Sequence, residues 1–139
     1  MTSPEAGPTS AKPVLIVDGA NVVGSRADGW WRDRAGANER LRDRLAALGG
    51  VEGLPEAGPG IAHPEIILVT EGAARGVPSV PGVRVVAAPG SGDDTIALLA
   101  VPEADESRTV VTADRELRRR AESAGASVVG PRWLLDRLG

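Results

Sequence analysis

The stretch Pro13-Val-Leu-Ile-Val-Asp18 joins an unbroken apolar run to a single carboxylate. An apolar run without alternating polar residues predicts a strand over residues 13–17 that is buried on both faces, as in a parallel sheet covered by helices. Asp18 then lies at the carboxyl end of that strand, the edge where open parallel sheets bind ligands. The rest of the chain is therefore expected to supply neighbours for both the strand and the acid.

Apolar runs and helix-like stretches alternate along the remainder of the chain. Further strands are expected over residues 65–70, 83–87, 109–112 and 127–129, and helices over 34–48, 93–100, 114–124 and 131–138. The Gly- and Pro-rich segment 51–64 is expected to be a long surface loop, and residues 1–12 a disordered tail. This alternation predicts one α/β domain over residues 13–139, with three layers and an open, mainly parallel sheet.

The composition excludes several classes of site. The absence of cysteine excludes a disulfide framework, a thiolate zinc site and a cysteine nucleophile. A P-loop is absent, because Lys12 is the only lysine and no Gly-x-x-x-x-Gly-Lys motif contains it. No apolar run reaches the roughly 20 residues of a membrane span, so we expect a cytoplasmic protein without a membrane partner. The net charge of −3 argues against a generally cationic nucleic-acid binder, although local arginine clusters still attract polyanions.

Acidic residues follow the expected strands at the same edge of the sheet as Asp18. Glu71 ends the second strand, Asp93 and Asp94 open the helix before the fourth strand, and Asp114 follows that strand. If the first and fourth strands are neighbours, these carboxylates lie close together and each raises the pKa of the next. A divalent cation relieves that repulsion, and hard oxygen ligands favour Mg²⁺ or Mn²⁺. The same aspartates also have a simpler reading as helix N-caps or turn residues, because Asp is favoured at both positions.

Three motifs around these acids are similar to those of a known nuclease group. They read Val-Asp-Gly-Ala-Asn-Val-Val over residues 17–23, Ser-Gly-Asp-Asp-Thr-Ile over 91–96 and Val-Thr-Ala-Asp-Arg-Glu-Leu over 111–117. In order and spacing the chain resembles the PIN-like NYN nuclease superfamily, near its YacP-like branch, over about residues 13–139. The stretch 25–34 departs from the family and resembles an actinobacterial subgroup. The resemblance implies a PIN-like sheet of strand order 3-2-1-4-5 and RNA as the substrate.

The resemblance also implies roles for individual residues. Asn21 matches an Asn that contacts a metal-bound water or the scissile phosphate, which places it in the catalytic set. Thr112 matches the small hydroxyl residue beside the last acid. The implied metal-binding and catalytic acids are Asp18, Asp93 and Asp114, with Asp94 and Glu71 as supporting metal ligands.

Two tryptophans and several arginines are candidate substrate-binding residues. Trp30 and Trp31 are adjacent, so they point in different directions, and one of them can stack on a base at the rim of the site. The alternative is that one of them fills a gap in an aromatic-poor core. Arg115 lies where it can orient a carboxylate or bind a phosphate. The predicted substrate-binding set is Asn21, Thr112, Arg115, Trp30 and Arg32, with Arg26 and Arg34 as further phosphate ligands.

Three other features have structural interpretations. The arginine run 118–120 is typical of a solvated helix face paired with nearby glutamates. Trp133 is expected in the core. His63 has no second histidine with which to form a metal site, so no role is assigned to it.

These observations predict a divalent-metal-dependent endoribonuclease that hydrolyses phosphodiester bonds of single-stranded RNA. A metal held by the carboxylates would polarise a phosphoryl oxygen and lower the pKa of a bound water, which needs no Cys, Ser or His nucleophile. Two alternatives remain open at this point. Some proteins similar to this subgroup are labelled nucleotide pyrophosphohydrolases, and a third reading is a catalytically inactive RNA-binding module. The sequence is compatible with an oligomer but does not predict one.

Overall fold

The apolar run after Lys12 forms the central strand of a five-stranded sheet, as expected. The strands of this sheet are β1 (Lys12–Asp18), β4 (Glu65–Thr70), β5 (Val83–Ala87), β6 (Glu106–Val111) and β7 (Ser127–Val129). Every pairing between neighbours is parallel. The computed structural model describes residues 11–26 and 29–139, so most of the expected tail, residues 1–12, lies outside the described residues.

The sheet has the strand order β5-β4-β1-β6-β7. These labels differ from the expected 3-2-1-4-5, because the sequence did not reveal the short strands β2 (Val51–Glu52) and β3 (Ile61–Ala62). The two form a separate antiparallel pair, so the expectation of an unpaired loop over 51–64 is wrong at these four residues. Counted in chain order within the large sheet alone, the strands run third, second, first, fourth, fifth.

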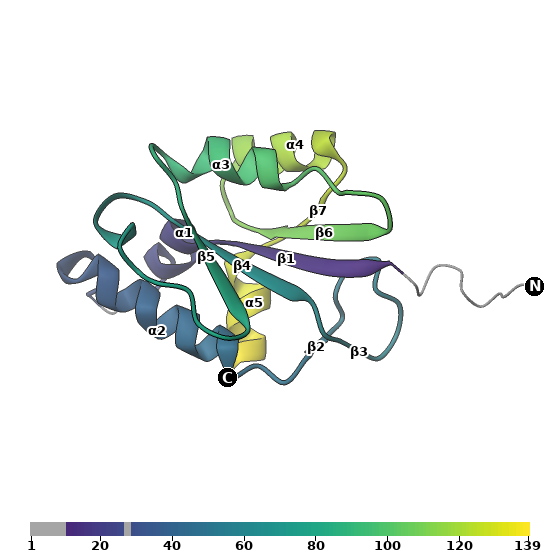
Figure 1. The fold of residues 1–139 in the computed structure, drawn as a ribbon, viewed down its shortest axis with the longest axis horizontal. Helices are drawn as coiled ribbons and strands as arrows, with labels where there is room; N and C mark the ends of the chain where they lie inside the picture. Colours follow the sequence, from purple (N-terminus) through teal and green to yellow (C-terminus); the bar gives the residue numbers. More distant parts are fainter. Residues whose placement is uncertain (1–10, 27–28) are drawn as a thin grey trace, which may run out of the picture.

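Helices cover both faces of the sheet and give three layers (Figure 1). One layer holds α3 and α4, and the other holds α1, α2 and α5. The α-helices are α1 (Gly19–Gly24), α2 (Arg34–Ala46), α3 (Gly92–Leu99), α4 (Arg115–Ala124) and α5 (Pro131–Leu138), and the short 3-10 helices are η3 (Trp30–Arg32) and η4 (Gly72–Ala74). Four of the five α-helices were expected at nearly these bounds, and α1 was not.

Strand β1 is apolar throughout because both of its faces are buried. Leu15 and Val17 point into the core under α1, α2 and α5, whereas Val14 and Ile16 point into the core under α3 and α4. Side chains alternate between the two faces of a strand, so one continuous apolar run supplies both cores. Burial on both faces therefore holds Asp18 rigidly at the end of β1.

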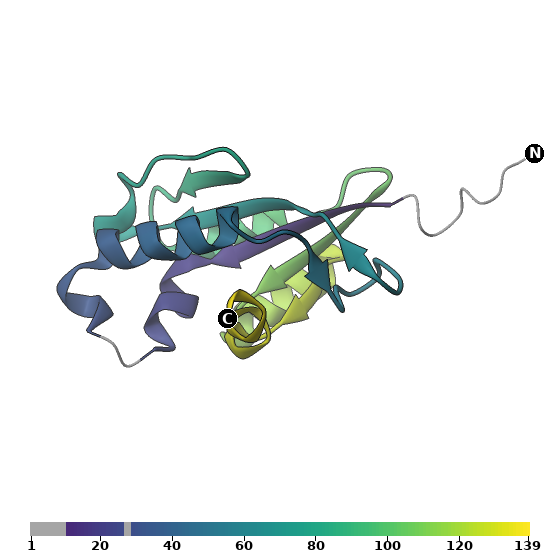
Figure 2. The ribbon, with the colours of Figure 1, turned by 90° about the horizontal axis from the view of Figure 1, so that it is seen from below.

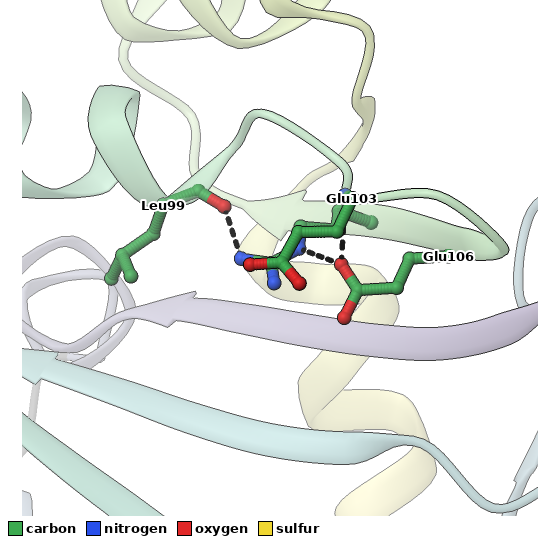
Figure 3. Close-up of polar contacts among 4 residues, drawn as sticks. Leu99, Glu103 and Glu106 are labelled. Carbon is green, nitrogen blue, oxygen red and sulfur yellow. Dashed lines mark hydrogen bonds and ion pairs between the residues drawn. The ribbon is translucent and has the colours of Figure 1, made fainter.

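At the amino end of β6, a cluster of hydrogen bonds holds the loop that joins α3 to β6 (Figure 3). Arg108 donates to the Leu99 carbonyl at 2.6 Å and to Oε1 of Glu106 at 2.7 Å. Glu103 donates its backbone N–H to the same Oε1 at 3.0 Å. The bond from Arg108 holds the pKa of Glu106 below its ordinary value. This cluster positions α3, which carries Asp93 at its other end.

Among the described residues, no helix has both the length and the apolar character needed to cross a membrane.

Candidate active site at the carboxyl edge of the sheet

Helix α1 begins directly after β1 and makes Asp18 its N-cap. The Asn21 N–H donates to Oδ1 of Asp18 at 3.3 Å. The helix starts at a glycine because it packs closely on β4: a Cβ at Gly19 would lie 2.7 Å from the Val69 carbonyl oxygen and 2.4 Å from Oδ1 of Asn38. The Asp-Gly pair of the motif therefore has two functions, since it caps α1 and lets it approach the sheet.

Asp18 is buried, with only 5% of its surface exposed. The Thr112 hydroxyl donates to Oδ2 of Asp18 at 2.9 Å, and the same hydroxyl accepts the Asp114 N–H at 3.2 Å. Thr112 is itself fully buried. The expected contact between Thr112 and substrate is therefore replaced by a positioning role, because its hydroxyl links two acids below the surface.

The pKa of Asp18 is raised from 3.8 to about 6. Burial is the main cause, and the negative charges of Asp93 and Glu71 add to it. The hydrogen bonds from Thr112 and Asn21 act in the opposite direction, since they favour the ionised form. Among the described residues, no arginine or lysine forms an ion pair with Asp18. The buried carboxylate therefore faces other carboxylates without a protein cation beside it.

Asp93 lies in the first turn of α3 and belongs to the same group of charges. Its pKa is raised by burial first and then by the charges of Asp114 and Glu71, whereas Arg120 lowers it. Glu71 follows β4 and accepts the Gly92 N–H at the start of α3, at 3.0 Å. That bond fixes the first turn of α3, and Asp93 with it, to the end of a buried strand. The charges of Asp93 and Glu71 therefore both act on Asp18, and the joint binding of one metal ion by Asp18, Asp93 and Asp114 stays a prediction.

Asp94 and Asp114 were both expected to bind the metal, but the structure places them in different surroundings. The Asp94 side chain is 83% exposed and pairs with Arg120 of α4 at 3.0 Å, so it lies at the surface against α4, although its charge still acts on Asp93. Asp114 is the N-cap of α4 and accepts the Leu117 N–H at 2.9 Å, but its charge still acts on Asp93. The N-cap interpretation is therefore right for Asp114, and Asp93 and Asp94 are first-turn residues instead.

Asn21 connects α1 to the loop before α4. Its Oδ1 accepts the Ala113 N–H at 2.8 Å. Because a backbone donor fixes the oxygen, the Nδ2 amide must point the other way, and it has no hydrogen bond with any described residue. Asn21 therefore lies next to Asp114 with its oxygen bound, and its expected contact with a metal-bound water or phosphate stays a prediction.

The two tryptophans separate into an inner and an outer residue. Trp30 is half-buried, packs on the core and lies under Arg34, whose guanidinium carbon is 5.3 Å from the ring centroid. Trp31 is 55% exposed, and Arg32 lies 5.7 Å from its ring. A cavity of about 110 Å³ beside Glu71 is lined in part by Trp30. The expectation that one of the two tryptophans fills a gap in the core thus holds in part for Trp30. The same side chain also borders the cavity beside Glu71.

The remaining expected residues lie as follows. Arg115 is exposed in the first turn of α4, one residue after Asp114. Arg119 pairs with Glu116, as expected for a solvated helix face. Trp133 is partly buried against the core and lies under Arg137. His63 is exposed and lines hollows bounded by residues at the amino ends of β4 and β5.

The carboxylates at this edge are chemically suited to a divalent cation, but they do not form a complete coordination shell. In the part of the chain that the structure describes, no group of three or more acidic or histidine side chains is arranged to hold a metal ion. Mg²⁺ commonly uses only one or two protein carboxylates and keeps several waters. Asp18 and Asp93 offer two hard oxygen donors, and the pKa of both is raised, first by burial and then by neighbouring carboxylates. The donor set therefore fits a partly hydrated Mg²⁺ or Mn²⁺.

Two buried polar residues near the site were missed in the sequence. Asn38 of α2 donates Nδ2 to the Arg34 carbonyl at 2.9 Å, and its Oδ1 has no partner among the described residues. The hydroxyl of Thr70, next to Glu71, is buried and equally unpartnered. A polar residue at position 38, on a helix face with Leu41 and Leu45, was the available signal, because such a face is otherwise apolar.

Comparisons with known proteins find similarity to solved structures only. No protein-family model matches the chain, and no curated protein does. Two crystal structures of Rae1 (YacP) from Bacillus subtilis are similar to it. The first, a point mutant, has a TM-score of 0.66 and 20% identity over 91% of this chain and 74% of that one. The second has a TM-score of 0.69 and 18% identity over 90% and 72%. The chain shares its fold with Rae1 (YacP). At this identity the likeness concerns the fold alone, and it agrees with the YacP-like resemblance found in the sequence.

Proposed function

We propose that this protein is a divalent-metal-dependent endoribonuclease. The observation that carries the proposal is the buried Asp18 carboxylate, which faces Asp93 and Glu71 and has no cationic partner among the described residues. A buried carboxylate without a counter-charge destabilises a fold, so its presence at a ligand-binding edge favours a function. The shared fold with YacP and the motif resemblance to YacP-like nucleases support RNA as the substrate.

Asp18 and Asp93 would hold the metal, with Glu71 and Asp114 adding negative potential around it. When bound, Mg²⁺ or Mn²⁺ would polarise a phosphoryl oxygen and make a bound water more acidic. Thr112 keeps the Asp18 carboxylate oriented and favours its ionised form. The Nδ2 amide of Asn21 would donate to a phosphate oxygen at this edge, because its Oδ1 is already bound to Ala113.

Substrate contacts would come from the rim of the site. Arg115 is exposed beside Asp114 and would bind a phosphate, and Arg32 would do the same from η3. The cavity beside Glu71 is smaller than the roughly 300–1,000 Å³ of pockets for drug-sized ligands, so it suits part of a nucleotide rather than a whole one. Trp30 at its wall would contact a base.

The test is cleavage of a labelled single-stranded RNA by the purified protein with Mn²⁺ or Mg²⁺. We expect cleavage by the native chain and a loss of at least about 100-fold in Asp18→Asn, because Asp18 would hold the metal that stabilises charge in the transition state. Asp105→Asn, which changes an exposed acid before the amino end of β6, is the matched control and should cleave normally. Equal activity of Asp18→Asn and the native chain would overturn the proposal.

The same assay separates the other two readings. Nucleoside triphosphates and dinucleotides are offered beside RNA under identical conditions. Preferential release of phosphate or pyrophosphate from nucleotides would identify a nucleotide pyrophosphohydrolase instead. Binding of RNA without any hydrolysis in either metal would identify an inactive module.

A further inference from the structure

A groove that the sequence reading did not foresee lies between α1, α2 and α5. It encloses about 220 Å³. Its apolar lining includes Val23, Leu41 and Leu135, and its polar lining consists of Arg26, Arg40 and Arg44. Figure 2 looks onto the face of the sheet covered by these three helices. Among the described residues that line it, the groove therefore combines an apolar floor with guanidinium groups and has no acidic side chain.

The charge of this groove is opposite to that of the whole chain. The protein has a net charge of −3, yet the charged lining residues are all arginines. Helix α2 supplies Arg40 and Arg44 on the same face as Ala37 and Leu41, because residues three and four positions apart are neighbours on a helix. A stripe of this kind presents positive charge over an apolar surface, which suits an anion with an apolar body.

The arginines of the groove differ in how far they are engaged. Arg44 donates to the carbonyl oxygens of Leu138 and Gly139, at 3.2 and 3.0 Å, and so ties α2 to the end of α5. Arg40 is exposed and makes no hydrogen bond or ion pair with any described residue. Arg44 therefore shapes the groove, whereas Arg40 is available for a ligand.

The groove continues to the acidic edge of the sheet. A second, more open hollow shares Arg26 and Leu135 with it, and its lining also includes Ala113, Arg132 and one acid, Asp136. Ala113 precedes Asp114, and its N–H binds Asn21 of the candidate active site. Arg132 is almost fully exposed and lies 4.0 Å from Asp136, a weak surface pair. A chain that leaves the carboxylates along this surface therefore meets Arg132, Arg26 and then Arg40.

We infer that the groove between α1, α2 and α5 binds the single-stranded RNA that flanks the scissile phosphate. This inference rests on the proposed function, which supplies the acidic edge as the cleavage point. Arg40 and the exposed Arg132 neutralise phosphates, and the apolar floor contacts the face of an unstacked base, which a duplex hides. Because the groove continues to the carboxylate edge, RNA that reaches the cleavage point is a better ligand for it than an unrelated acidic protein.

The test is RNA binding without catalysis, measured by fluorescence anisotropy with a labelled single-stranded oligoribonucleotide in EDTA. We expect Arg40→Glu to weaken binding at least about tenfold and to reduce the slope of log K against log salt by about 0.7 or more, the value for one phosphate contact on a single strand. Arg40→Gln should give a smaller loss in the same direction. The matched control is Arg84→Glu, because Arg84 is an exposed arginine on β5 near the opposite end of the sheet. Its binding should equal that of the native chain.

Several outcomes would overturn the inference. These are native-like binding by Arg40→Glu, an equal loss in Arg84→Glu, equal affinity for a duplex of the same length, and displacement of the RNA by polyglutamate as effectively as by unlabelled RNA. Thermal unfolding of each variant shows whether it is folded, and an exposed side chain is not expected to affect folding. Failure of the proposed function gives a different result from failure of this inference. If only the proposed function fails, Asp18→Asn cleaves as the native chain does, while Arg40→Glu still loses RNA binding.

Discussion

Asp18 has two chemical roles that oppose each other in the metal-free protein. It caps α1 and accepts the Thr112 hydroxyl, which are stabilising interactions. Its burial, together with the charges of Asp93 and Glu71, raises its pKa to about 6, so its ionised form destabilises the native state. The residue is thus retained at a cost in stability, as is common at functional sites.

The first prediction concerns pH. The pKa of Asp18 is higher in the native state than in the unfolded chain, so the native state binds more protons between about pH 4 and pH 6. Stability from this group is therefore lost as the pH rises through that window, and the full cost above it is about 3 kcal/mol. We expect Asp18→Asn to be more stable than the native chain at pH 7.5 without metal, and the difference to shrink towards pH 4.

This prediction is checked by urea unfolding at several pH values in EDTA. Asp136→Asn, which alters an exposed acid by the same chemical change, serves as the control and should follow the native chain. A native chain more stable than Asp18→Asn at pH 7.5 would contradict the expected sign.

A second prediction uses the two adjacent acids of α3. Asp93 shares the field of Asp114 and Glu71, whereas Asp94 is exposed and pairs with Arg120. We expect Asp93→Asn to lower kcat/KM for RNA cleavage at least about tenfold and Asp94→Asn to change it by less than about threefold, because a surface pair contributes little. Both rates come from one assay on the same RNA. Similar losses in the two variants would show that Asp94 also serves the site.

At the scale of the elements, three helices begin at the same edge of the sheet. Helix α1 begins at Asp18, α3 begins beside Glu71, and α4 begins at Asp114. Each start brings backbone N–H groups and a positive helix end to the carboxylates. The helix starts therefore orient the acids, and a cap and a site residue can be the same side chain.

The third prediction separates these two roles in Asp114. Asn is as good an N-cap as Asp, whereas Ala removes the bond to Leu117 and costs about 1 kcal/mol. We expect Asp114→Asn to keep its stability within about 0.5 kcal/mol and Asp114→Ala to lose about 1 kcal/mol. Both should lose RNA cleavage, because both remove the charge near Asp93. Unfolding and cleavage are measured on the same preparations, and full activity in Asp114→Asn would reduce the residue to a cap.

At the scale of the whole molecule, the proposed metal site predicts that a divalent cation stabilises the native state. A cation that binds the native edge and not the unfolded chain stabilises the protein, by about 2.7 kcal/mol at 100 times its Kd. We expect Mn²⁺ to raise the Tm of the native chain by several degrees, since roughly 2–4 °C follow from each kcal/mol in a protein of about this size.

The comparison chain for this fourth prediction is Asp18→Asn, whose Tm should not respond to Mn²⁺. Asp94→Asn is the positive control, because its exposed carboxylate lies away from Asp18 and its Tm should still rise. The measurement is differential scanning calorimetry over a range of Mn²⁺ concentrations. An equal rise in all three chains would place the metal elsewhere.

Much of the fold could be predicted because buried parallel strands and capped helices have strong local signals. The apolar run of β1 and the Pro131 that starts α5 are such signals. Helix α1 was missed because six residues are too few to show helical periodicity. The pair β2–β3 was missed because each strand has two residues, and pairing across a Gly-rich segment leaves no local pattern.

By itself, the sequence determined the chemical kind of the site: carboxylates placed after buried strands, with Asn21 and Thr112 close by. Only the tertiary structure decided which carboxylates face one another. Asp93 and Asp94 are adjacent, but successive residues of a helix point about 100° apart. The charge of Asp93 acts on Asp18, whereas Asp94 forms an ion pair with Arg120. The groove could not be read from the sequence for the same reason, since its walls come from three helices that only packing brings together.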